Sequence, residues 1–250
     1  MKTQKHRNIY SNLSGITLKH DNFKLKSISS SVRTFAPAIL YEDDDLCVID
    51  KPAGFVVSRD EKSRVLDFDN TKFIVHRLDK DTSGVLIAAK TQNAQIELSK
   101  QFAEHMVKKY YTALIYGHLT PKTGRIEAGI GRSVVNRKKM SIFSHKLRMA
   151  ATNYRVIDYI GPFTLLDLDI ETGRTHQIRV HLSSIGFPIV GDPVYGNKKI
   201  NREISKKYGL NRQFLHAREI QFILPSSGKM KSVSSKLPTD LKNMLEKLNQ

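Results

Sequence analysis

The sequence predicts an α+β fold built on a mixed, mainly antiparallel β-sheet flanked by helices and loops. Short apolar runs rich in β-branched and aromatic residues outnumber the segments with helical periodicity, and most of these runs follow one another across short polar turns. Strands joined in this way pair antiparallel, whereas a doubly wound parallel sheet needs a helix between successive strands. The chain has 250 residues, 40% of them apolar, and can therefore enclose a substantial core.

Residues 1–34 predict a basic N-terminal arm, because Asp21 is their only acid among many lysines and arginines. Weak alternation of apolar residues over 16–25 is compatible with a short hairpin. The segment is too poor in apolar residues to form a complete separate module. Residues 35–250 then predict one main domain.

Five strands are expected before residue 90, at residues 39–41, 46–49, 55–57, 73–75 and 85–89. Acidic residues 42–45 and the sequence KPAG at 51–54 supply turns between the first three strands. Cys47 is the only cysteine, so no disulfide can form within the chain, and its apolar neighbours predict a buried, inert thiol. This cysteine usage fits a reducing compartment.

A helix of about four turns is expected after Thr91, which is a suitable N-cap. Apolar residues recur there at every fourth position, at Ala94, Leu98, Phe102 and Met106. Residues 109–116 are rich in β-formers and predict a strand that ends at Gly117.

Residues 120–148 predict a loop that contains a hairpin, and the part from 132 to 148 has no acidic residue. Two further strands are expected at 152–159 and 163–170. The second alternates leucine and isoleucine with carboxylates, which indicates one buried face and one wet face.

The last third of the chain predicts two helices and a strand. A short helix begins after residues 172–175 and ends at Gly186, residues 197–212 are basic and irregular, and 214–224 form a strand. A C-terminal helix begins near Thr239, with an apolar stripe at Leu241, Met244, Leu245 and Leu248.

The chain is strongly basic, with 41 lysines and arginines against 24 acidic residues and a formal charge of +17. Such a charge predicts a polyanionic partner, for which nucleic acid is favoured over an anionic membrane. No apolar run approaches the roughly 18 residues of a spanning helix, and neither a secretory signal nor a lipidation motif is present. We therefore expect a cytoplasmic protein.

Three groups of residues carry chemistry. The sequence HRLDKDTSG at 76–84 crowds ionisable groups between two apolar runs, and it is either a charged surface turn or a site; spacing does not separate Asp79 from Asp81. Tyr110 and Tyr111 follow Lys109, and a tyrosine there packs in the core or stacks on a base.

The third group, residues 172–181, places two arginines, two histidines and a glutamine at the start of a helix, as an anion cradle does. His176 and His181 are five residues apart and do not share one helical face, so no metal site is expected. The nucleotide-binding patterns GxxxxGK[ST] and GxGxxG and the serine elbow GxSxG are absent too, so no cofactor is expected.

The chain resembles the RluA family of RNA pseudouridine synthases in segments that occur in the family's order. These are YEDDDLCVIDKPAG at 41–54, HRLDKDTSG at 76–84, KYYTALIYG at 109–117, ETGRTHQIRVHLSSIGFPIVGDPVYG at 171–196 and LHA at 215–217. The resemblance implies an isomerase that converts uridine to pseudouridine in large-subunit ribosomal RNA or transfer RNA, without a cofactor. A monomer is expected.

The resemblance also assigns residues. Asp79 is the essential aspartate, Tyr111 stacks on the target base, Arg179 pairs with the aspartate, and Arg77 helps to hold or replace the flipped nucleotide. Further contacts to the substrate are expected from His76, Arg174, His176 and Gln177. Contacts to the RNA backbone are expected from Arg132, Arg137, Lys138, Lys139, Lys198 and Lys199.

Two other hypotheses remain. The first is an RNA-binding or ribosome-assembly protein that keeps this fold without catalysis, and the basic charge alone favours it. The second is a metal-dependent hydrolase that uses His76, His176 and His181.

Overall fold

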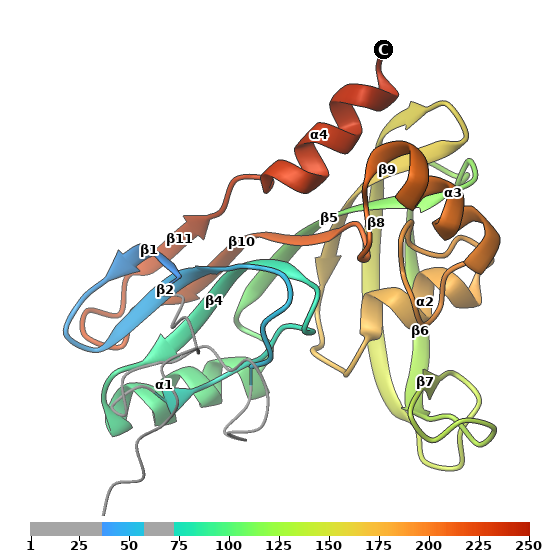
Figure 1. The fold of residues 1–250 in the computed structure, drawn as a ribbon. Helices are drawn as coiled ribbons and strands as arrows, with labels where there is room; N and C mark the ends of the chain where they lie inside the picture. The colour runs from blue at the N-terminus through green and yellow to red at the C-terminus, as the bar shows by residue number, and fades with distance from the viewer. Residues whose placement is uncertain (1–36, 58–72) are drawn as a thin grey trace, which may run out of the picture. The chain divides into compact units, whose positions relative to one another are not determined.

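The computed structural model describes residues 37–57 and 73–250, and one mixed sheet organises them (Figure 1). Along the sheet the strands follow the order β1-β2-β4-β10-β5-β9-β8-β6-β7, with β3 paired to β4 and β11 paired to β10. Of these pairings only β4 with β10 is parallel. The expected α+β class with a mainly antiparallel sheet is confirmed.

The strands are β1 Ala38–Glu42, β2 Leu46–Lys51, β3 Phe73–Ile74, β4 Ser83–Ala89, β5 Lys108–Tyr116, β6 Thr123–Arg132, β7 Met140–Ser141, β8 Arg148–Ile160, β9 Phe163–Ile170, β10 Leu215–Ile223 and β11 Met230–Ser234. The helices are α1 Gln92–Ala103, α2 Gln177–Ser184, α3 Lys198–Tyr208 and α4 Thr239–Leu248.

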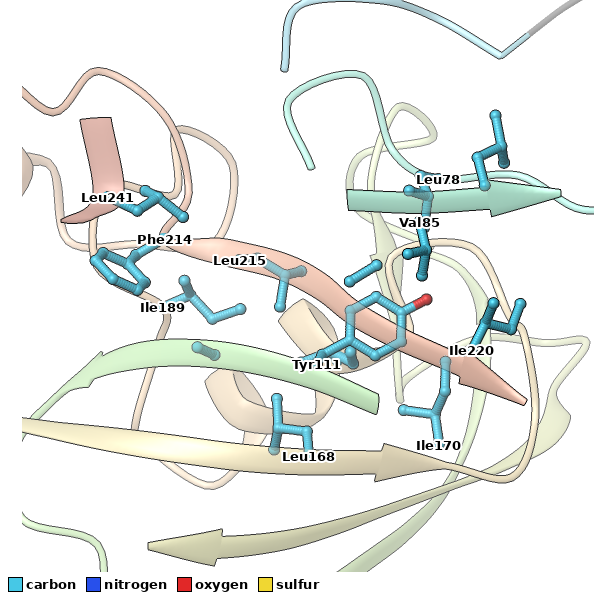
Figure 2. Packing of buried hydrophobic residues seen from close by; sticks show 14 of the residues in the cluster. Leu78, Val85, Tyr111, Leu168, Ile170, Ile189, Phe214, Leu215, Ile220 and Leu241 are labelled. Atoms are coloured by element: carbon cyan, nitrogen blue, oxygen red, sulfur yellow. The ribbon is translucent and has the colours of Figure 1, made fainter. Parts of the chain in front are cut away.

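The core lies on the central strands, where β4 is buried along its whole length. Strand β9 buries alternate residues, as its sequence predicts, with Leu166 and Leu168 at most 1% exposed. Figure 2 shows side chains of this core converging from β4, β5, β9 and β10 around the ring of Tyr111. Tyr111 on β5, one of the expected site residues, is therefore part of the core.

Helix α1 packs on β3 and β4, and Thr91 caps it as expected, because its hydroxyl accepts a hydrogen bond from Ala94 N at 3.2 Å. The helix has 12 residues, about three turns rather than four. It ends before His105, which takes a left-handed conformation with φ of 58°. Met106, expected on the apolar face, is 43% exposed.

Helices α2 and α4 confirm the remaining two helix predictions. Helix α2 packs on β6 and β8. Helix α4 begins at Thr239 and buries Leu241 and Met244 completely.

Residues 197–212, expected to be irregular, contain α3, so that prediction is wrong. Asn197 caps the helix by accepting hydrogen bonds from the backbone N–H groups of Lys199 and Ile200 at 2.9 and 3.2 Å. The helix buries Ile204. A four-residue spacing of apolar residues was present in the sequence, but the surrounding charges obscured it.

Two further predictions need correction, and one strand was missed. Residues 55–57 contain one bridge residue rather than a strand. The first part of the expected 120–148 loop is the ten-residue strand β6, which pairs with β8. The hairpin expected within these residues is present, because β6 also pairs antiparallel with β7. Strand β11 was not anticipated.

The predicted basic arm at 1–34, with its possible hairpin at 16–25, lies outside the described residues. No helix in the described part of the chain is long and apolar enough to cross a membrane.

Candidate active site

Asp79 lies on the loop that connects β3 to β4, and backbone hydrogen bonds hold this loop in place. The backbone N–H of Thr82 donates to Asp79 O at 3.1 Å, and that of Gly54 donates to Lys80 O at 2.9 Å. The loop is thus joined to the KPAG turn that follows β2.

Lys51 strengthens this junction from inside the core. Its side chain is completely buried, and Nζ donates to the carbonyl oxygens of Pro52, Phe55 and Lys80 at 2.9 to 3.0 Å. Burial lowers the pKa of Lys51 to about 8. The ammonium group acts as a clamp between the turn and the residue next to Asp79.

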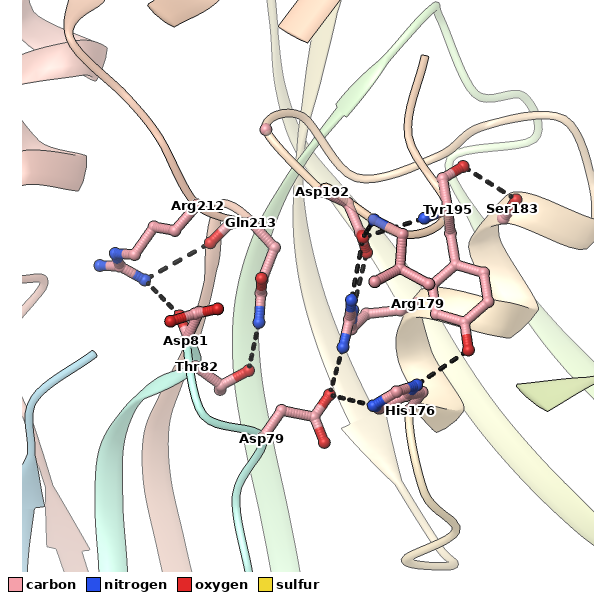
Figure 3. A network of polar contacts seen from close by, with 12 residues as sticks. Asp79, Asp81, Thr82, His176, Arg179, Ser183, Asp192, Tyr195, Arg212 and Gln213 are labelled. Atoms are coloured by element: carbon pink, nitrogen blue, oxygen red, sulfur yellow. Dashed lines mark hydrogen bonds and ion pairs between the residues drawn. The ribbon is translucent and has the colours of Figure 1, made fainter. Parts of the chain in front are cut away.

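Arg212 holds the other end of the loop. Its guanidinium donates to Asp81 O at 3.1 Å and to Ser83 Oγ at 3.3 Å, and it forms an ion pair with Asp240 at the start of α4 at 2.6 Å. Figure 3 shows the contact between Arg212 and Asp81, at the other end of the loop from Asp79. Asp81 therefore contributes its backbone carbonyl to the loop's structure.

The carboxylate of Asp79 meets Arg179 from the first turn of α2. Arg179 Nη1 donates to Asp79 Oδ2 at 2.9 Å, while Nε and Nη2 donate to the two carboxylate oxygens of Asp192 at 2.7 and 2.9 Å (Figure 3). A bidentate contact of this kind fixes the plane of the guanidinium as well as its position. Asp192 thus aims Arg179 at Asp79.

The surroundings of Arg179 and Asp192 determine the charge of both groups. Burial alone would lower the pKa of Arg179, but its contacts with Asp192 and Asp79 raise that pKa above its usual value. Burial would raise the pKa of Asp192, but the hydrogen bonds and charge of Arg179 hold it below its usual value. Both groups are therefore charged at neutral pH.

His176 precedes α2 in a left-handed conformation with φ of 56°. Its Nδ1 lies 2.8 Å from the hydroxyl of Tyr195, and its Nε2 lies 3.9 Å from Asp79 Oδ2. Burial lowers the pKa of His176, although the charge of Asp79 acts in the opposite direction. His176 thus faces the same carboxylate as Arg179.

A small cleft of about 80 Å³ opens beside Asp79. Its polar lining includes Arg77, Arg174, His176 and Arg179, and its apolar lining is Leu78, Tyr111, Ile170, Ile178 and Leu215. Tyr111 is 8% exposed, and burial together with the charge of Asp79 raises the pKa of its hydroxyl. A lining that combines charged and apolar side chains suits a flat polar ligand such as a base.

A larger cleft of about 790 Å³ adjoins the small one, because Gly173, Arg174 and Thr175 line both. Five further basic side chains contribute to its lining, namely Arg132, Arg137, His145, Lys146 and Arg148. The two clefts form a continuous surface that is basic in one part and holds Asp79 in the other.

The structure brings seven of the expected residues together around the small cleft, namely Asp79, Tyr111, Arg179, Arg77, Arg174, His176 and Gln177. His76 does not belong to this group. Its ring stacks on Phe102 with centroids 4.6 Å apart, and its Nε2 accepts a hydrogen bond from Ile87 N at 2.9 Å. We therefore correct the prediction that His76 contacts the substrate.

Gln177 lines the small cleft, but internal contacts satisfy its side chain. Its Oε1 accepts hydrogen bonds from Thr172 Oγ1 and Arg174 N, and its Nε2 donates to Ala151 O and Thr152 Oγ1. A carboxamide has two donor hydrogens and two acceptor lone pairs, so this one has none to spare. These four hydrogen bonds fix Gln177 against the 172–176 turn and the start of β8.

The residues expected to bind the RNA backbone are dispersed. Arg132 and Arg137 line the large cleft, whereas Lys198 and Lys199 lie on α3 and line neither cleft. The ammonium of Lys139 donates to Val194 O at 2.8 Å, and Lys138 is exposed outside the lining of either cleft.

Four residues that shape the site were missed by sequence reasoning: Lys51, Asp192, Tyr195 and Arg212. Lys51, Asp192 and Tyr195 lie inside the quoted motifs KPAG and GDPVYG or directly beside them. The motifs gave their positions but no reason to connect them with Asp79, which follows only from the folded arrangement.

Of the three histidines of the metal hypothesis, only His176 lines the small cleft. His181 is completely buried, and its Nδ1 lies 3.0 Å from Thr152 Oγ1. Within residues 37–57 and 73–250, no three His, Cys, Asp or Glu side chains are grouped as a metal ion requires.

Comparison with known proteins bears directly on this arrangement. The sequence profile of the RNA pseudouridylate synthase family matches residues 45–184, which include Asp79, Tyr111 and Arg179. The chain belongs to this family. The resemblance to the RluA type of RNA pseudouridine synthases is thereby confirmed, and the chain is an isomerase by family.

Relatives within the pseudouridine synthase family cover most of the chain. It is 36% identical to a ribosomal large subunit pseudouridine synthase D of Zymomonas mobilis, over 95% of this chain and 85% of the relative. A protein of the same description from Pseudomonas aeruginosa is 38% identical over 85% of this chain and 72% of its own length.

Two solved human pseudouridylate synthase structures share the fold. RNA Pseudouridylate Synthase Domain Containing 4 has a TM-score of 0.68 at 26% identity, with 84% of this chain and 92% of that chain covered. RNA Pseudouridylate Synthase Domain Containing 1 also has a TM-score of 0.68, at 29% identity, with 81% and 84% covered. The sheet described above is therefore the fold of pseudouridine synthases.

Proposed function

We propose that this chain converts uridine to pseudouridine in large-subunit ribosomal RNA and that Asp79 is its essential carboxylate. The observation that carries the proposal is the placement of Asp79, which Arg179 holds at 2.9 Å beside a cleft lined by Tyr111. The relatives described as ribosomal large subunit pseudouridine synthases support this class of RNA.

The reaction calls for a charged group beside the glycosidic bond. The bond from uracil N1 to the sugar C1′ breaks, the base turns, and C5 bonds to C1′; C5 loses a proton and N1 gains one. The reaction is neither a reduction nor an oxidation. A carboxylate acts in such chemistry as a nucleophile or as a stabiliser of positive charge at the glycosidic carbon. Asp79 is placed for either role.

Tyr111 supplies an apolar face for the base. Because burial and the charge of Asp79 raise the pKa of Tyr111, its phenol stays protonated at neutral pH. A protonated phenol is a poor base, so we assign Tyr111 to stacking rather than to removal of the C5 proton.

Arg77 and the large cleft account for the rest of the RNA. Arg77 is exposed at the rim of the small cleft, where a guanidinium can take the place of a flipped base or hold its phosphate. Arg132 and Arg137 line the large cleft and would neutralise phosphates on either side of the target.

The first prediction tests Asp79. We expect Asp79→Asn to reduce pseudouridine formation by at least about a thousandfold and to leave RNA affinity within about twofold, because the change removes the reacting carboxylate but preserves the cleft. The assay is tritium release from RNA labelled at uridine C5. The matched variant Asp81→Asn should retain activity, because Asp81 accepts the hydrogen bond of Arg212 through its backbone carbonyl, which the substitution keeps.

A second arm of the same experiment identifies the RNA. Pseudouridines are mapped in total RNA from cells with and without the gene. If the cells without the gene lack a pseudouridine in large-subunit ribosomal RNA, the proposal is supported. If they lack one only in transfer RNA, transfer RNA is the substrate instead. Full activity in Asp79→Asn would remove Asp79 from its proposed role, and no lost site in any RNA would favour the non-catalytic RNA-binding hypothesis.

A further inference from the structure

The hydroxyl of Tyr195 lies between the backbone of β7 and the imidazole of His176. It is 2.9 Å from the backbone nitrogen of Met140 in β7 and 2.8 Å from His176 Nδ1. His176 Nε2 in turn lies 3.9 Å from Asp79 Oδ2, and Figure 3 shows Tyr195, His176 and Asp79 in one line of contacts. Tyr195 therefore stands two contacts away from the proposed reacting group.

The chemistry of these groups favours one direction for each hydrogen bond. A backbone N–H only donates, so the Tyr195 hydroxyl accepts the hydrogen bond from Met140. The single proton of that hydroxyl finds an acceptor in an unprotonated His176 Nδ1, whereas a protonated Nδ1 would leave the Nε2 lone pair turned towards the carboxylate of Asp79. A neutral imidazole that accepts at Nδ1 carries its proton on Nε2. His176 consequently presents an N–H donor to the cleft beside Asp79.

The same turn also fixes Arg179, the second group that faces Asp79. Asp192 Oδ1 accepts hydrogen bonds from the backbone N–H groups of Val194 and Tyr195 at 2.8 and 3.0 Å, while Asp192 holds the guanidinium of Arg179. That guanidinium lies over the ring of Tyr195, with 5.1 Å between Cζ and the ring centroid. Residues 192–195 thus set the position of both donors at Asp79.

Two contacts join this turn to the basic segment 133–147 between β6 and β8. One is the hydrogen bond from Met140 to the Tyr195 hydroxyl, and the other is the hydrogen bond from Lys139 Nζ to Val194 O at 2.8 Å. Arg137, which lines the large cleft, belongs to the same segment. RNA bound to this segment would therefore act on the turn that orients His176 through these two hydrogen bonds.

We propose that Tyr195 is a positioning residue for pseudouridine formation. It holds His176 in the tautomer with the proton on Nε2, directed at the cleft, and it couples that orientation to the basic segment 133–147. The role rests on the proposed function of Asp79, because His176 matters to the reaction only if the chemistry takes place beside that carboxylate.

The direct test is the tautomer of His176 in the free protein. Two-bond nitrogen–proton NMR spectra of protein labelled with ¹⁵N-histidine distinguish protonated from unprotonated ring nitrogens, and His176→Asn assigns the signal. In the unmodified protein we expect an unprotonated Nδ1 and a protonated Nε2. In Tyr195→Phe we expect a mixture of the two tautomers, because the phenyl ring no longer donates to Nδ1.

The kinetic test separates positioning from binding. The substrate is RNA labelled with tritium at uridine C5 and taken from cells that lack the gene. In Tyr195→Phe we expect the single-turnover rate at saturating enzyme to fall by about tenfold, which corresponds to the loss of one hydrogen bond in the transition state. The dissociation constant for the same RNA should change by less than about twofold.

Two further variants make the test specific. Tyr159→Phe removes a hydroxyl that donates to Leu119 O at 2.9 Å outside the lining of either cleft, and it should leave the rate unchanged. His176→Asn keeps a residue that tolerates the left-handed conformation. In that background Tyr195→Phe should have little further effect, because Tyr195 acts through His176.

Each outcome decides the proposal. A protonated Nδ1 on His176 in the unmodified protein overturns it without any variant, so a poorly folded Tyr195→Phe does not leave it untested. An unchanged rate in a folded Tyr195→Phe, or additive losses in the double variant, also overturns it. These failures differ from failure of the proposed function, which shows itself as full activity in Asp79→Asn.

Discussion

His76 lies three residues before Asp79, and its imidazole serves the interior of the protein. The ring stacks on Phe102 of α1, and Nε2 accepts the hydrogen bond of Ile87 N in β4. An imidazole nitrogen accepts a hydrogen bond only while it is unprotonated. Burial, together with the charge of Lys109, lowers the pKa of His76 to about 3.

The low pKa of His76 predicts a loss of stability in acid. The pKa in the unfolded chain is about 6.5, so between about pH 6.5 and pH 3 the unfolded state binds a proton that the folded state does not. The contribution of His76 to stability is complete above pH 6.5 and declines by about 1.4 kcal/mol for each pH unit below it.

Urea unfolding at several pH values between about 7 and 4 measures this slope. We expect His76→Gln, which can still accept the hydrogen bond but does not titrate, to reduce the slope by about 1.4 kcal/mol per pH unit. The exposed loop variant His145→Gln should keep the slope of the unmodified protein. An equal slope in both variants would show that His76 is protonated in the folded protein.

Among the elements, β4 carries the greatest structural demand, because it joins two parts of the sheet directly after the loop of Asp79. It pairs antiparallel with β2 along its length and parallel with β10 only at Ser83 and Gly84. Gly84 has a φ of 116°, and a Cβ there would overlap the backbone carbonyl of Ala217 in β10. A glycine is required by both conformation and space.

We therefore expect Gly84→Ala to destabilise the protein by at least about 3 kcal/mol, because the methyl group forces β4 and β10 apart. The matched variant Gly161→Ala has a positive φ of 53° but open space around the added methyl group. Its cost should be about 1 kcal/mol. Chemical denaturation measures both values, and similar losses would show that the backbone conformation alone, and not the close approach, makes Gly84 necessary.

The elements that the sequence predicted well are those whose own residues carry a strong period. Strand β9 alternates apolar and acidic residues and was predicted over its observed range of 163–170. Strand β6 has the sequence TGRIEAGIGR, whose three glycines conceal a strand that its pairing with β8 stabilises. Helix α3 has apolar residues at every fourth position, but its six lysine, arginine and glutamate side chains suggested an irregular segment.

The candidate site was also predicted in part. The motifs located Asp79, Tyr111 and Arg179, but their spacing could not choose Asp79 over Asp81. In the structure the Asp79 side chain faces Arg179, whereas the Asp81 carbonyl faces Arg212. These orientations depend on partners 100 and 131 residues away along the chain, so no local pattern contains them.

At the scale of the whole molecule, the effect of the formal charge of +17 on RNA binding depends on where the basic side chains lie. The large cleft gathers arginines and lysines from β6, from residues 133–148 and from Arg174, and it leads into the small cleft beside Asp79. An RNA strand that places one uridine at Asp79 would therefore lay neighbouring phosphates along these cations. Helix α3 is also strongly basic, but its Lys198 and Lys199 lie outside both clefts.

This difference predicts how RNA affinity depends on salt. Each phosphate contact releases bound counterions, so the logarithm of the affinity falls with the logarithm of the salt concentration by about 0.7 to 0.9 for each contact. In the double variant Arg132→Gln/Arg137→Gln we expect this slope to become shallower by about 1.4 to 1.8, because two contacts are lost. The measurement is fluorescence anisotropy of a labelled RNA stem-loop with uridines in its loop, from about 50 to 200 mM KCl.

The double variant Lys198→Gln/Lys199→Gln is the control, because it removes the same charge from α3. It should change the slope by less than about half as much, since these lysines line neither cleft. Equal changes in the two variants would mean that the RNA also follows α3, and no change in the arginine variant would remove the large cleft from the binding surface.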